Sequence, residues 1–114
     1  MENQSKLHKA LADNNRIVIL KLLLKYDLCV GALSKRLNIS KSAISQHLKI
    51  LREVGLVWGE KRGYFTHYYV DRNLLKEAAR QLNELSNLPR GPSECLHSHS
   101  NNHSCGRKER KQNV

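Results

Sequence analysis

The sequence predicts a mainly α-helical domain with a small β-hairpin, followed by a polar tail. Three observations support this fold class. Apolar residues recur at helical spacing through most of residues 7–54. Two short stretches rich in aromatic and β-branched residues then flank a glycine between residues 56 and 70, as in a hairpin. Helical spacing returns from Leu75, and apolar residues become rare from Pro89 onward.

The first two helices are indicated by apolar spacing and by a capping residue between them. Leu7, Ala10 and Leu11 form one short helical stripe. Asp13 or Asn14 can cap the helix that follows, because either side chain can accept a hydrogen bond from a backbone N–H at the helix start. Apolar residues lie on nearly all sides of this second helix, so we expect it at the centre of the domain.

A third, short helix is indicated by the spacing of Ala32, Leu33 and Leu37. It should end at Asn38, since asparagine tolerates the left-handed conformation that a tight turn needs. Ile39 is then expected to fill the inside of that turn.

The fourth helix has the best-marked ends in the sequence. Ser40 is a good N-cap, and Gly55 occupies the position where a left-handed residue commonly ends a helix. The residues predicted to be buried share one stripe: Ile44, Leu48, Leu51 and Val54. The opposite side is rich in serine, glutamine, histidine and lysine, although serine has a lower helix propensity than the Glu, Lys and Ala of an ordinary soluble surface.

Two strands and a last helix complete the domain. Residues 56–60 and 64–70 are predicted strands joined through Lys61, Arg62 and Gly63, which gives a basic hairpin. In the last helix, apolar residues repeat at spacings of three, four and three: Leu75, Ala78, Leu82 and Leu85. This narrow seam suits packing against another helix, including the same helix of a second subunit.

Two short helices joined by a tight turn and followed by a basic hairpin are typical of a winged helix-turn-helix, in which the second helix enters the major groove of DNA. Gln46 is then the strongest base reader, because its amide can bond two atoms of adenine, while Ser42 and Ser45 read base edges weakly. Phosphate contacts are predicted for Lys41, Lys49 and Arg52, and backbone or minor-groove contacts for Lys61 and Arg62 at the hairpin tip. His47, beside the buried stripe, could either bond to the neighbouring helix or contact DNA.

The charge of the chain favours a polyanionic partner. The 114 residues hold 20 Lys and Arg against 10 Asp and Glu, a net charge of +10. Residues 31–70 alone carry seven basic side chains against two acidic ones. We recognise no nucleophile with a paired base, no phosphate loop and no pair of carboxylates placed for catalysis, so we do not expect an enzyme.

The longest apolar stretch, residues 17–26, is interrupted by two lysines and is shorter than the roughly 20 residues that cross a bilayer. The first eleven residues lack the cationic and apolar segments of a secretory signal, so we expect a cytoplasmic protein with no membrane partner. Its three cysteines, Cys29, Cys95 and Cys105, would be mostly reduced there and are candidates for metal or redox chemistry.

Residues 10–57 read ALADNNRIVILKLLLKYDLCVGALSKRLNISKSAISQHLKILREVGLV, and the second strand runs into HYYVD. This combination resembles the ArsR/SmtB family of metal-responsive bacterial and archaeal repressors over roughly residues 7–86. The resemblance implies a winged helix-turn-helix that is dimeric through its first and last helices. It also implies that the homodimer binds an inverted-repeat operator in double-stranded DNA through Ser42, Ser45 and Gln46, and that an inducer releases it.

Two metal sites of that family are incomplete in this chain. Family members that sense arsenite, cadmium or lead often have a CVC run, where this chain reads Cys29-Val30-Gly31. Members that sense zinc or cobalt use Asp and His residues on the last helix. The corresponding positions here contain no histidine: Asp71, Asn73, Glu84 and Asn87. The resemblance therefore does not supply the inducer.

The composition divides the chain into a DNA-binding and dimerisation domain, residues 1–88, and a flexible basic tail, residues 89–114. Five sulfur and nitrogen donors lie within eleven tail residues: Cys95, His97, His99, His103 and Cys105. Such a set can enclose a Zn, Ni, Co, Cu(I) or Cd ion. Alternatively, Cys29 joins Cys95 and Cys105 in the three-sulfur set that arsenite favours. No metal is expected to be needed for folding, and an incidental tail with loose metal affinity is a further alternative.

Three interpretations of the function remain open. The first is a dimeric repressor that a metal or metalloid ion releases from its operator. The second is a thiol redox switch, in which Cys95 and Cys105 form a disulfide. The third is a constitutive DNA-binding protein whose tail only adds positive charge.

Overall fold

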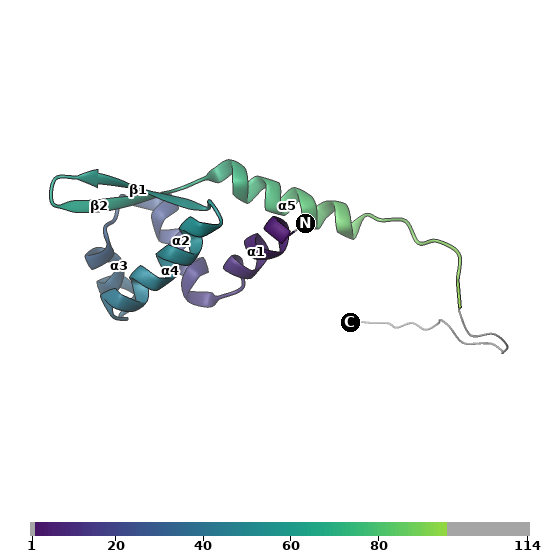
Figure 1. The fold of residues 1–114 in the computed structure, drawn as a ribbon, viewed down its shortest axis with the longest axis horizontal. Helices are drawn as coiled ribbons and strands as arrows, with labels where there is room; N and C mark the ends of the chain where they lie inside the picture. The colour runs from purple at the N-terminus through teal and green to yellow at the C-terminus, as the bar shows by residue number, and fades with distance from the viewer. Residues whose placement is uncertain (1, 96–114) are drawn as a thin grey trace.

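The computed structural model describes residues 2–95. Five helices and two strands follow one another in this part of the chain: α1 (Glu2–Leu11), α2 (Asn14–Lys25), α3 (Val30–Leu37), α4 (Lys41–Glu53), β1 (Val57–Arg62), β2 (Phe65–Val70) and α5 (Arg72–Ser86). Figure 1 shows the β1–β2 hairpin above α3 at one end of the folded body, with α1 beside α5 toward the other end. The predicted winged helix-turn-helix is confirmed.

The second helix, α2, lies at the centre of the fold, as its nearly all-round apolar surface predicts. It contacts α1, α3, α4 and β2. Its N-terminus is capped by Asp13, whose carboxylate accepts a hydrogen bond of 3.1 Å from the N–H of Arg16. The largest side chains with almost no exposure come from several elements and form one core: Ile19, Leu33, Ile44, Leu48, Leu51 and Leu56.

The turn between α3 and α4 is fixed by local hydrogen bonds. Asn38 adopts the predicted left-handed conformation, with a φ of 58°. The hydroxyl of Ser34 donates to the carbonyl of Ile39 at 2.6 Å, and Ser40 caps α4 by accepting a backbone N–H at 3.0 Å. After α4, Gly55 has a φ of 84°, a conformation that strains residues with a side chain. The predicted ends of α4 are therefore confirmed.

The hairpin differs from the prediction at its turn. Arg62 pairs with Phe65 at the end of the antiparallel ladder, so the two turn residues are Gly63 and Tyr64. Lys61 is likewise a paired strand residue. The predicted placement of Lys61 and Arg62 in the turn is wrong, because glycine at the first of two turn positions, here with a φ of 67°, closes a hairpin without them.

The last helix, α5, packs against α1, and the side chains of His8 and Gln81 share a hydrogen bond of 3.3 Å between the two helices. It ends at Ser86, and residues 87–95 contain no helix or strand. The predicted domain boundary at residue 88 stays a prediction. Four predicted metal ligands lie outside the described residues: His97, His99, His103 and Cys105. No helix within residues 2–95 is long and apolar enough to cross a membrane.

Candidate nucleic-acid interface

One side of α4 is buried in the core, and the opposite side is exposed. Ile44, Leu48 and Leu51 are each at most 1% exposed. The side chains predicted to contact DNA are exposed, and none makes a side-chain hydrogen bond or ion pair within the described part of the chain: Lys41, Ser42, Ser45, Gln46 and Lys49. Their donors and acceptors are therefore available to a ligand.

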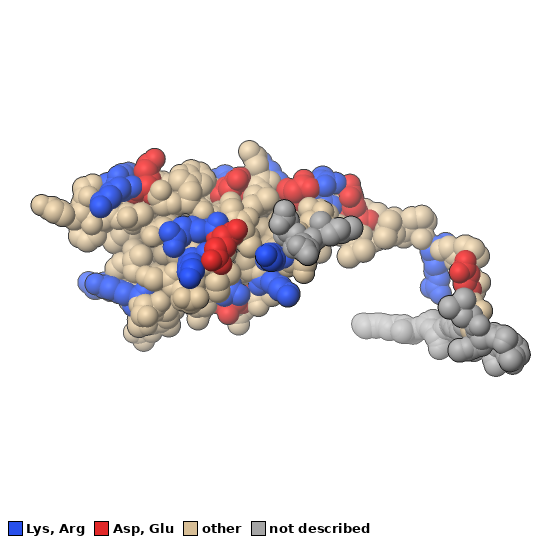
Figure 2. All heavy atoms as spheres, viewed as in Figure 1, with Lys and Arg blue, Asp and Glu red and all other residues tan. Residues whose placement is uncertain are grey.

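The exposed side of α4 belongs to a basic part of the surface. Figure 2 shows Lys and Arg side chains over α3 and α4 on this face, whereas acidic side chains are more frequent along α5. The first turn of α4 contains no acidic residue, so the positive end of its helix dipole is not neutralised there. Such a surface attracts the phosphates of a nucleic acid.

His47 lies at the border between the two sides of α4 and is partly buried. A guanidinium nitrogen of Arg16, on α2, lies 3.3 Å from its Nδ1 in a hydrogen bond. Arg16 also donates through Nε to the carbonyl of Ala10 at 2.7 Å, at the end of α1. Of the two roles left open for His47, the structure therefore shows the bond to the neighbouring helix.

A cluster of polar side chains joins the wing to the loop after α2. Asp27, in that loop, accepts two hydrogen bonds of 2.7 Å from the guanidinium of Arg62. Its other carboxylate oxygen lies 2.7 Å from Nδ1 of His67 and accepts a 3.3 Å hydrogen bond from the hydroxyl of Tyr69. The hydrogen bond with His67, together with the positive charge of Arg62, lowers the pKa of Asp27 below its ordinary value. We call these four residues the Asp27 cluster.

The two basic wing residues thus differ in their surroundings. Arg62 forms an ion pair with Asp27 and donates from both terminal nitrogens to the same carboxylate oxygen, Oδ2. Lys61 is exposed and, because side chains alternate along a strand, it lies on the opposite face of the hairpin.

The predicted metal ligands lie only partly within the described residues. Cys29 is half-buried at the N-cap of α3, and its backbone forms an isolated β-bridge with His67. Cys95 is exposed and is the last described residue of the segment that follows α5. Figure 1 shows this segment leaving α5 in the direction away from α3. Within residues 2–95, no group of three or more His, Cys, Asp or Glu side chains is placed to hold a metal ion.

On the last helix, the two carboxylates at the family's metal positions have other partners in the described part of the chain. Asp71 is used as its N-cap and accepts a hydrogen bond of 3.1 Å from the N–H of Leu74. Glu84 is paired with Arg80 on the same helix. The helix α5 contains no histidine that could bind a metal together with these carboxylates.

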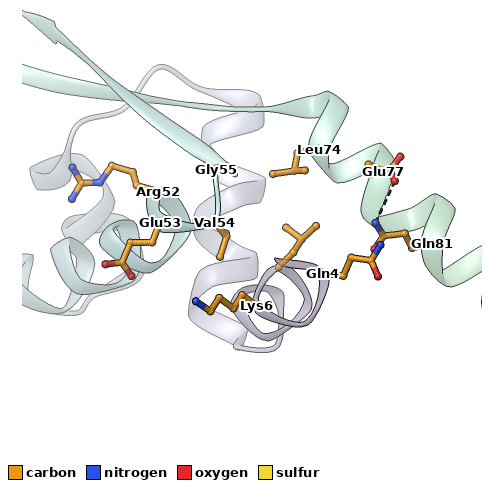
Figure 3. A pocket seen from close by; sticks show the side chains of 10 residues that line it. Gln4, Lys6, Arg52, Glu53, Val54, Gly55, Leu74, Glu77 and Gln81 are labelled. Atoms are coloured by element: carbon orange, nitrogen blue, oxygen red, sulfur yellow. Dashed lines mark hydrogen bonds between the residues drawn. The ribbon is translucent and has the colours of Figure 1, made fainter. Parts of the chain in front are cut away.

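A hollow with a volume of about 490 Å³ lies away from the polar side of α4, between α1, α5 and the C-terminal end of α4. Figure 3 shows Gln4 and Lys6 of α1 on one side of it and Glu77 and Gln81 of α5 on another. Arg52, also predicted to bind phosphate, borders this hollow. Among residues 2–95, none of the other predicted DNA or metal ligands lines it.

Known regulatory proteins are similar to this chain in sequence. A family described as bacterial regulatory protein, arsR family, matches residues 13–58. The transcriptional activator HlyU of Vibrio cholerae is 42% identical over 79 residues, which are 69% of this chain and 73% of HlyU. The arsenical resistance operon repressor of Escherichia coli K12 is 39% identical over 80 residues, which are 69% of this chain and 68% of the repressor.

The fold is also similar to that of a solved protein. An ArsR-like transcriptional regulator from Rhodococcus sp. RHA1 matches with a TM-score of 0.68 at 32% sequence identity. The match covers 75% of this chain and 80% of that regulator.

Proposed function

Because this chain belongs to the arsR family of bacterial regulatory proteins, we propose that it is a repressor that reads its operator with α4. The observation that carries this proposal is the division of α4 into a buried side and an exposed polar side. Short hydroxyl and amide side chains near the start of this helix have the size and the hydrogen-bonding groups to reach base edges in a major groove. One relative is named an activator and another a repressor. That this chain represses transcription is therefore part of our proposal.

The polar side chains of α4 have different roles in this proposal. Gln46 bonds to adenine through both atoms of its amide, and Ser42 and Ser45 add weaker base contacts. Lys41 and Lys49 bind phosphates, and the positive end of the helix dipole helps only near Lys41, in the first turn of α4. Base contacts supply the specificity, and phosphate contacts supply most of the affinity and its dependence on salt.

The form that binds the operator is a homodimer. Three leucines in the last turns of α5 and just after it are largely exposed in the single chain: Leu82 at 53%, Leu85 at 64% and Leu88 at 69%. Burying them against a second copy, through α1 and α5, would remove this apolar surface from water. A two-fold axis through such a contact relates the two α4 helices, as an inverted-repeat operator requires.

The inducer is a thiophilic or borderline metal ion, or arsenite. Its ligands come from the tail donors, with Cys29 of either subunit as a further thiolate: Cys95, His97, His99, His103 and Cys105. Thiolate and imidazole donors suit Zn, Ni, Co, Cu(I) and Cd. An ion that binds more tightly to a weakly DNA-binding conformation shifts the population away from the operator. A coupling free energy of about 1–3 kcal/mol changes the affinity for DNA roughly 5- to 150-fold.

The test is fluorescence anisotropy of the reduced protein on its own upstream DNA, titrated separately with Zn, Ni, Co, Cu(I), Cd and arsenite. The full chain is compared with a chain that lacks residues 89–114. One ion should release the full chain from DNA and leave the truncated chain bound.

Other results would select the alternatives. Release by an oxidant without metal, unchanged when His97, His99 and His103 are replaced by alanine, would favour the redox switch. Weaker DNA binding of the truncated chain, with no response to any ion or oxidant, would favour the constitutive DNA-binding protein. Equal affinity for upstream and random DNA would contradict the repressor itself.

A further inference from the structure

The loop after α2 pairs with the hairpin along the outer edge of β2. The backbone of Cys29 forms an isolated β-bridge with His67 of β2, and His67 is also paired with β1. A β-strand can pair with one neighbour along each of its two edges, so the loop and β1 lie on opposite sides of β2. Arg62, on β1, therefore reaches across β2 to bond with Asp27 in the loop.

Both oxygens of one carboxylate are used by side chains from two strands. Oδ2 of Asp27 accepts from Nη1 and Nη2 of Arg62, each at 2.7 Å, while Oδ1 bonds His67 at 2.7 Å and Tyr69 at 3.3 Å. Charge-assisted hydrogen bonds of this kind are stronger than neutral ones, and here bonds from three different side chains meet on one carboxylate. A tilt of the wing away from α2 would have to break these bonds together.

We infer that Asp27 is a positioning residue for DNA binding, which fixes the wing relative to α4, and that Arg62 acts through Asp27 rather than through a phosphate. This inference rests on the proposed DNA-binding function. Lys61 lies on the other face of the hairpin, outside the Asp27 cluster, and is the wing cation that contacts the DNA backbone.

The opposite arrangement is that Asp27 only occupies Arg62 until DNA arrives. Removing the carboxylate would then release a guanidinium for a phosphate and strengthen DNA binding. In our arrangement, removing the same carboxylate loosens the wing and weakens DNA binding. The sign of the change in affinity therefore separates the two.

The first experiment measures operator affinity of the full chain by fluorescence anisotropy for D27A, R62A and the double variant. D27A and R62A should each weaken binding by about two- to fivefold, the range of an exposed ion pair. The double variant should be no weaker than either single variant, because both remove the same interaction.

Two matched control variants separate the effect of the ion pair from the effect of changing the net charge. E60A removes the same negative charge from an exposed residue of β1 and should not weaken operator binding. K61A should reduce the slope of log affinity against log salt by about 0.9 for each subunit, as the loss of one phosphate contact does. Stronger or unchanged binding by D27A, or additive losses in the double variant, would overturn the inference.

A second experiment needs no DNA. Backbone amides of residues 61–65 should exchange hydrogen faster in D27A and R62A than in the unchanged chain and E60A, because the wing is less restrained. Unchanged exchange in D27A would overturn the positioning role of Asp27. Faster exchange in a protein that binds no operator would support that role and contradict only the proposed function.

Discussion

Gln46 and Lys49 lie near each other on the exposed side of α4 and are expected to contribute to DNA binding in different ways. The amide of Gln46 carries a donor and an acceptor, which match the edge of one base. The ammonium of Lys49 is a point charge that any phosphate satisfies. Gln46 should therefore contribute to sequence specificity, and Lys49 to the salt dependence of binding.

We predict that Q46A reduces discrimination between operator and a base-substituted operator by about 1–3 kcal/mol. K49A should weaken binding to all sequences and lower the salt slope by about 0.9 for each subunit. Anisotropy titrations at several salt concentrations measure both effects. K21A, which removes the same charge from an exposed position on α2, is the control and should change neither quantity. Unchanged discrimination in Q46A would rule out its role as a base reader.

The Asp27 cluster makes stability depend on pH in a defined direction. The pKa of Asp27 is lowered in the folded chain, so the ionised carboxylate stabilises the fold above the unfolded value of 3.8. This contribution is lost as pH falls through the lowered pKa. We predict that urea unfolding separates the unchanged chain from D27N at pH 6 and that the difference disappears toward pH 2. A difference that persists at pH 2 would contradict the assignment.

Local residues were predictable, and distant ones were not. Asn38, Ser40 and Gly55 act through the backbone of their own turn, so their types alone indicate their conformations. The partners of Asp27 lie 35, 40 and 42 positions further along the chain. No spacing rule connects them, because their meeting depends on how the hairpin packs beside α2.

At the scale of elements, α4 combines a cap that serves stability with a neighbouring serine proposed to serve recognition. The hydroxyl of Ser40 accepts a hydrogen bond from the backbone, while Ser42 is exposed and makes no side-chain hydrogen bond within residues 2–95. The same serine-to-alanine change at these two positions therefore tests structure and function separately.

We predict that S40A lowers the free energy of unfolding by about 1 kcal/mol, the usual cost of losing an N-cap. S42A should leave stability nearly unchanged and weaken discrimination between operator and random DNA. Urea unfolding at one fixed protein concentration measures the stability, because a dimer's stability depends on concentration. Equal loss of stability in both variants would contradict the assigned roles.

The hairpin shows the limit of predicting an element from composition. Aromatic and β-branched residues indicated both strands, and glycine indicated the reversal between them. The turn nevertheless consists of Gly63 and Tyr64, after Lys61 and Arg62, because the strand pairing extends to the last pair that a two-residue turn permits. That shift moves Arg62 out of the tip and into pairing with Asp27.

At the scale of the whole molecule, the seam predicted on the last helix is only half covered in one chain. Ala78 is buried, whereas Leu82 and Leu85 are mostly exposed although they continue the same spacing. The sequence indicated a seam and a possible second subunit. Within residues 2–95, no other part of the same chain buries Leu82 and Leu85.

We predict that L82E/L85E is monomeric and loses most of its operator affinity, because each operator half-site would be bound separately. Sedimentation equilibrium measures the assembly. V18E places a single glutamate at an exposed apolar residue of α2, 39% exposed, and should remain dimeric. A dimeric L82E/L85E would show that another surface joins the subunits.

The central claim is that the exposed side of α4 reads the operator. The most direct measurement compares S42A/S45A/Q46A with the unchanged chain, by anisotropy, on the operator and on a duplex of the same composition in scrambled order. We predict that the variant binds both duplexes with similar affinity, close to that of the unchanged chain for the scrambled duplex. A variant that still prefers the operator as strongly as the unchanged chain would contradict the claim.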